Sequence, residues 1–130
     1  MIGLDTSAII DIFKGDNNIK QFLKKNKEPL AATLISYLEL FFGLDPRNPK
    51  HAIEERYYDE FFKSLYNLNL TKNSCKEASK IFWELKKKGE SIEQFDCIIA
   101  ALLLTNGINK IVTRNTKHFE KIKQLRAIGY

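Results

Sequence analysis

The chain has 130 residues, of which 44% are hydrophobic and 28% are charged, and these values suit one soluble globular domain. No apolar run reaches the roughly 18 residues that suggest a membrane span, and the first apolar run lacks the basic flank of a signal peptide. The formal net charge is +5, and residues 110–130 carry six basic residues against one acid. This basic segment suits a polyanionic partner, and a solvated lysine-rich surface explains it equally well. We expect a single cytoplasmic domain spanning residues 1–130.

Short apolar segments alternate with segments of helical periodicity, which predicts an α/β fold around a parallel sheet. Strands are expected at residues 1–4, 29–32, 68–70 and 110–113, with a weaker fifth strand at 126–128. Helices are expected at residues 8–14, 17–25, 34–42, 51–65, 71–88 and 91–106. Hydroxyl side chains precede several of these helices, and Thr6 or Ser7 and then Thr33 are the expected caps.

The helix expected at residues 51–65 has more apolar surface than a single core contact needs. Its predicted inward face comprises Ile53, Tyr57, Phe61 and Leu65, and Tyr58 and Phe62 widen that face. Aromatic residues on a helix are usually core residues. A two-sided apolar helix can also pair with a second copy of the chain or receive a partner segment in a groove.

The chain has two cysteines, Cys75 and Cys97, and their spacing is not that of metal ligands. Both are expected to be buried thiols on helices, and one disulfide between them is the minor alternative. A reducing cytoplasm is the simplest setting for such a pair.

Three carboxylates stand where an apolar side chain would be expected. Asp5 ends the first apolar run, Glu39 lies one helical turn from Ile35, and Asp96 is spaced in the same way from Ile99. Ionised side chains are rarely buried without a partner, because removing a charge from water is costly. The pattern therefore predicts a shared acidic pocket whose counter-charge is a metal ion.

The predicted topology gathers these acids at one edge of the sheet. Sites in open α/β sheets form beyond the carboxyl ends of the strands, where Asp5 and the segment Thr113-Arg114-Asn115 both lie. Magnesium and manganese prefer oxygen ligands, often carboxylates together with water and substrate phosphates. Hydrolysis of a phosphodiester is the natural reaction for such a site.

Four segments of the chain resemble, in order, the four motifs of PIN-domain ribonucleases. They are Ile2–Ile10, Ile35–Leu40 followed by Gly43, Asp96–Ala101 and Val112–Phe119, the last in the form common among VapC-type toxins. The resemblance implies a three-layer α/β/α fold with a central parallel sheet of four to five strands. It also implies a Mg²⁺- or Mn²⁺-dependent endoribonuclease with an RNA substrate, usually the toxin of a pair whose antitoxin neutralises it.

By motif position, Asp5, Glu39 and Asp96 would be the metal-site acids and Asn115 would complete the catalytic group. Many PIN domains have a fourth acid near Asn115, and an amide there implies weak binding of a second metal. The hydroxyls of Thr6 and Thr113 and the side chains of Arg114 and Lys117 are the expected substrate contacts. Three nearby side chains are assigned no site role. Asp11 is expected in solvent, and His118 is expected to be structural beside Phe119. Glu93 is expected on a solvated face, although its position three residues before Asp96 would also let it approach the pocket.

Other functions compete with the toxin. A housekeeping PIN nuclease in RNA processing would show the same motifs, and a PIN-like module could bind RNA or protein without cutting. Phosphoryl transfer through Asp5 is disfavoured, because such phosphatases commonly carry a second Asp two residues later, where Ser7 stands here. The wide aromatic helix favours a homodimer.

Overall fold

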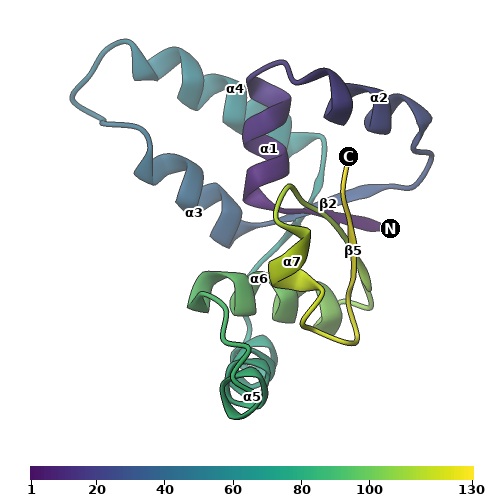
Figure 1. Cartoon of the computed structure of the whole chain (residues 1–130). Helices are drawn as coiled ribbons and strands as arrows, with labels where there is room; N and C mark the ends of the chain where they lie inside the picture. Colours follow the sequence, from purple (N-terminus) through teal and green to yellow (C-terminus); the bar gives the residue numbers. More distant parts are fainter.

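The computed structural model describes all 130 residues (Figure 1). The elements in chain order are β1 (Ile2–Leu4), α1 (Thr6–Phe13), α2 (Asn17–Lys25), β2 (Leu30–Thr33), α3 (Leu34–Phe42), α4 (His51–Lys63), β3 (Tyr66–Leu68), α5 (Lys72–Lys87), α6 (Gln94–Thr105), β4 (Lys110–Val112), α7 (Thr116–Phe119) and β5 (Arg126–Ile128). No helix is long and apolar enough to cross a membrane.

The five strands form one sheet in the order β3-β2-β1-β4-β5, and every neighbouring pair is parallel. Alternate residues of the strands supply two separate cores, one on each face of the sheet. Ala31 and Ile111 pack with α5 and α6, whereas Leu4, Ala32 and Val112 pack with α1 to α4. The predicted three-layer α/β/α fold with a parallel sheet is therefore confirmed, and the weak fifth strand is present.

Several boundaries differ from those predicted. The third strand is Tyr66–Leu68, two residues earlier than expected, and the last of the major helices begins at Gln94 rather than Ser91. The first helix begins at Thr6, so Asp5 occupies its N-cap position and neither Thr6 nor Ser7 caps it. Thr33 caps α3 as predicted, by accepting a hydrogen bond from the Ser36 amide at 3.1 Å.

The inward face predicted for α4 is wrong over its first half. Ile53 and Tyr57 are 62% and 60% exposed, whereas the neighbouring Tyr58 and Phe62 turn toward the core. The Tyr58 ring meets Phe13 of α1 edge-on, with ring centroids 4.8 Å apart. Contacts with other helices thus determine which face of α4 is buried. This face is rotated about the helix axis by about 100° from the one that the hydrophobic periodicity predicted.

The predicted burial of Cys75 is also wrong, because this thiol is exposed, whereas Cys97 is buried as expected. The buried side of α5 passes instead through Ser74, Ala78, Ile81 and Leu85. Ser74 and Thr71 form a capping box at the start of the helix, which rotates Cys75 outward.

Gly3 of β1 lies in close contact with Leu103 of α6. A methyl group on Gly3 would lie 2.5 Å from Cδ2 of Leu103, a side chain that is itself fully buried. We predict that Gly3→Ala lowers the free energy of unfolding by about 1–3 kcal/mol through overpacking. Chemical denaturation measures the change. If the cause is overpacking, a Gly3→Ala/Leu103→Ala double variant loses less than the sum of the two single losses, and simple additivity would contradict this explanation.

Candidate acidic site at the strand ends

A pocket of about 240 Å³, with space for several water molecules, lies beyond the carboxyl ends of β1 and β4. Its lining residues come mainly from the starts of α1, α6 and α7 and from α3. Its lining comprises Asp5, Thr6, Ser7, Ile10, Glu39, Glu93, Asp96, Arg114, Asn115 and His118. The three acids singled out by the sequence therefore share one pocket.

Asp5 is only 3% exposed, and two hydroxyl groups hold its carboxylate. Ser7 Oγ and Thr113 Oγ1 each donate to Asp5 Oδ2 at 2.8 Å. The backbone amide of Asn115 in turn donates to Thr113 Oγ1 at 2.9 Å. Thr113 is fully buried behind Asp5, so its hydroxyl orients the carboxylate and shapes the Asn115 turn without lining the pocket.

Glu39 is joined to α1 through Thr6. The Thr6 hydroxyl lies 2.7 Å from Glu39 Oε1, to which it donates, and 2.9 Å from Ser36 Oγ. Burial raises the pKa of Glu39, and the negative charges of Asp5, Asp96 and Glu93 raise it further, against the lowering effect of the Thr6 bond. The carboxylate is thus held in place while its charge stays poorly compensated.

Asp96 lies in the first turn of α6, facing His118 of α7. The distance between His118 Nδ1 and Asp96 Oδ2 is 3.3 Å. Burial raises the pKa of Asp96, and the charge of Asp5 adds to this effect, while His118 lowers it. His118, which was expected to be structural, lines the pocket and contacts one of its acids.

The remaining predicted residues divide between the pocket and its surroundings. Arg114 and Asn115 line the pocket, but Lys117 is exposed outside the lining. Glu93, expected in solvent, is exposed and lines the pocket rim. Sequence reasoning gave no orienting role to Ser7, although a hydroxyl two residues after a strand-end acid is a usable signal.

The chemistry of these donors fits a hard divalent cation better than a soft metal. Three carboxylates and one amide offer oxygen ligands, which Mg²⁺ and Mn²⁺ prefer, and the lining includes no thiol. Burial, and after it the charges of the neighbouring acids, raises the pKa values of Glu39 and Asp96, so a bound cation would stabilise their ionised forms. As the side chains stand, no three His, Cys, Asp or Glu residues are grouped closely enough to hold a metal ion.

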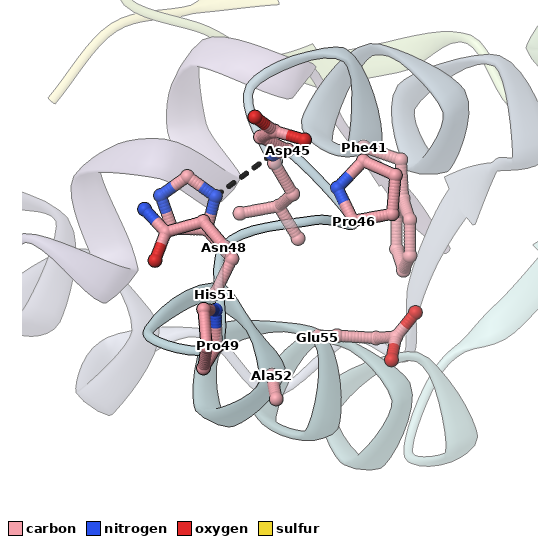
Figure 2. A pocket seen from close by; sticks show the side chains of 9 residues that line it. Phe41, Asp45, Pro46, Asn48, Pro49, His51, Ala52 and Glu55 are labelled. Atoms are coloured by element: carbon pink, nitrogen blue, oxygen red, sulfur yellow. Dashed lines mark hydrogen bonds between the residues drawn. The ribbon is translucent and has the colours of Figure 1, made fainter.

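A second cavity, of about 280 Å³, lies in the loop between α3 and α4 (Figure 2). Figure 2 shows Pro46 and Pro49 in its wall and the Asp45 amide donating to His51 Nδ1 at 2.8 Å. None of the three site acids lines it. Its polar side chains all come from the short stretch Asp45 to Glu55, so we assign the chemistry to the acidic pocket.

A parallel-sheet α/β domain with an acidic pocket at its strand ends is the class of protein that these observations define. The PIN domain model matches residues 2–125, and the chain belongs to that family. It is 28% identical to Ribonuclease VapC1 of Methanocaldococcus jannaschii over 93% of this chain and 80% of that protein. It is 33% identical to Ribonuclease VapC3 of the same organism over 76% and 94%. VapBC-1 from nontypeable Haemophilus influenzae superposes with a TM-score of 0.80 at 27% identity, covering 99% and 98% of the chains.

Burial of Glu39, together with repulsion from the neighbouring acids, should lower the stability of the folded protein. The pKa of Glu39 is raised on folding, so its charge destabilises the folded state at pH above that pKa, and the cost vanishes as pH falls below its ordinary value. We expect Glu39→Gln, which keeps an oxygen for the Thr6 hydroxyl, to raise Tm by about 2–3 °C in EDTA at pH 7.5. The gain should disappear near pH 4. Differential scanning calorimetry tests this, and a lower Tm at pH 7.5 would contradict it.

Proposed function

We propose that this protein is a Mg²⁺- or Mn²⁺-dependent endoribonuclease and the toxin of a toxin–antitoxin pair. One observation carries the proposal: Asp5, Glu39 and Asp96 share a pocket with Arg114 at the strand ends of a PIN-domain chain. Relatives named Ribonuclease VapC support the activity. The VapC-type motif form supports the toxin role.

In this proposal Asp5, Glu39 and Asp96 hold the metal ion, which when bound neutralises charge on the phosphate and favours ionisation of the attacking water. Ser7 and Thr113 both donate to Oδ2 of Asp5, which leaves Oδ1 free of hydrogen bonds to serve as the ligand. Arg114 binds a phosphate oxygen at the rim, and Asn115 completes the polar wall. Lys117, just outside the pocket, attracts the RNA backbone.

The antitoxin is the second partner that we propose. Exposed apolar side chains lie at Ile53 and Tyr57 of α4 and at Leu34, Leu38 and Phe42 of α3. Such surfaces can receive an apolar antitoxin segment or a second copy of the chain. The homodimer stays a prediction, and sedimentation velocity of the isolated chain measures it.

The nuclease is tested with purified protein and a structured RNA pool, in Mn²⁺, Mg²⁺ or EDTA. We expect cleavage by the wild type with either metal and none in EDTA. Asp5→Asn and Asp96→Asn should each lower the cleavage rate by more than about 100-fold, because each removes a charged ligand. Glu90→Gln, an exposed acid outside the pocket, is the matched control and should cleave normally.

Circular dichroism must show that the inactive variants are folded. Full activity in verified metal-free buffer would exclude the metal role. Binding of RNA without cleavage in any metal would favour the non-catalytic module.

Toxicity separates the toxin from a housekeeping nuclease. We expect induction of the wild type in a bacterial host to arrest growth, and Asp5→Asn at equal protein level to leave growth unchanged. Co-expression of the adjacent reading frame, if it encodes a small DNA-binding protein, should restore growth. Active enzyme without growth arrest would favour the RNA-processing role.

A further inference from the structure

Asp11 is a buried acid outside the set of metal-site candidates. It lies on α1 between one and two turns beyond Asp5, and it was expected in solvent, but it is only 7% exposed. A buried carboxylate is costly unless it is paired and hydrogen-bonded. Asp11 has two partners, both of which come from the other end of the chain.

The first partner is Tyr130, whose hydroxyl donates to Asp11 Oδ2 at 2.5 Å. The second is Arg114, whose Nε lies 3.6 Å from the same oxygen, within ion-pair range but beyond a normal hydrogen bond. Burial and the contact with Asp11 raise the pKa of the Tyr130 phenol, so it remains a donor at neutral pH.

Sheet register places these two partners side by side. Val112 of β4 pairs with Ile128 of β5, and Arg114 and Tyr130 each follow two residues later. The segments that follow β4 and β5 both reach α1, where Arg114 and Tyr130 contact Asp11. Figure 1 shows the segment after β5 running to the C-terminus on the side of the sheet that carries α1. The contact with Asp11 is thus a consequence of strand pairing.

Arg114 is therefore fixed at two points. Its backbone amide donates to Ser7 Oγ at 3.1 Å, and Ser7 itself holds Asp5. Its side chain is half exposed and lines the acidic pocket, with Nε directed at Asp11. An ion pair on the Nε side of the guanidinium leaves its two terminal NH₂ groups free, and these form the fork that binds phosphate oxygens.

We propose that Asp11 and Tyr130 are positioning residues that hold the Arg114 guanidinium at the rim of the pocket, where it meets an RNA phosphate. The proposal rests on the proposed function for its substrate. The proposal leaves the roles of the three proposed metal ligands unchanged. It adds to the site a buried support that links α1 to the ends of β4 and β5.

The anchoring is measured without RNA. In ¹⁵N-labelled protein, we expect the Arg114 Nε–Hε signal to exchange with water several-fold more slowly in the wild type than in Asp11→Asn. Tyr130→Phe should have an intermediate effect, because it removes one donor and leaves the carboxylate charge. Equal exchange in the wild type and Asp11→Asn would overturn the proposal.

The functional part is a double-mutant cycle on RNA cleavage. We expect Asp11→Asn to raise KM about 3–10-fold with kcat nearly unchanged, since it loosens substrate binding rather than the chemistry. Arg114→Ala should raise KM at least as much, and Asp11→Asn should add nothing in the Arg114→Ala background. Additive effects on KM would show that Asp11 acts elsewhere and would overturn the proposal.

The chain contains a matched control. Tyr37 donates to Asp59 Oδ1 at 2.5 Å between α3 and α4, outside the pocket lining. Tyr37→Phe removes the same kind of bond as Tyr130→Phe and should leave KM unchanged, so an equal rise in both variants would contradict a positioning role.

If no RNA is cleaved or bound while the Arg114 signal stays protected, the proposed function fails, and with it the substrate part of this proposal.

Discussion

Burial of the Asp5 carboxylate at the end of the central strand is the constraint on which the rest of the site depends. An Asp at a helix N-cap normally accepts a hydrogen bond from an amide of the first turn, but Asp5 makes no such bond. Its carboxylate instead accepts hydroxyl donors from α1 and from the residue after β4. The pairing of β1 with β4, in which the Asp5 amide donates to the Val112 carbonyl, brings those donors together. The register of β1 with β4 therefore determines how the Asp5 carboxylate is oriented.

A pocket with three acids opposes folding, and the architecture compensates on both sides of the sheet. Separate cores lie on the two faces, and none of the three acids belongs to either core. The acids themselves stand on different elements, and each has at least one polar contact: Asp5 with Ser7, Glu39 with Thr6, and Asp96 with His118. These contacts keep the carboxylates in place without neutralising them. Their negative charge is therefore available to a bound cation.

The sequence was sufficient to predict the parallel sheet, its fifth strand and the gathering of the three acids, because strand ends and helix periods are local signals. It failed where a contact between elements decides the outcome. The period of α4 selects Ile53, yet rings from α1 and α3 fix Tyr58 and Phe62 inward. Asp11 has the spacing of a solvent-facing residue, and only the register of β4 with β5 supplies its partners. Supporting residues are harder to predict than ligands for this reason.

The acidic pocket also repels the phosphate that it is proposed to cut, so positive charge is needed where the RNA enters. Residues 110–130 alone account for the net charge of +5, and they include Lys117, Lys121 and Lys123. Exposed lysines attract RNA from a distance, but salt screens their effect beyond about 10 Å. Arg114 differs because it lines the pocket and its side chain faces a buried acid. A mobile lysine raises the encounter rate, whereas an anchored guanidinium also selects where the phosphate comes to rest, and cleavage at a defined bond needs the second property.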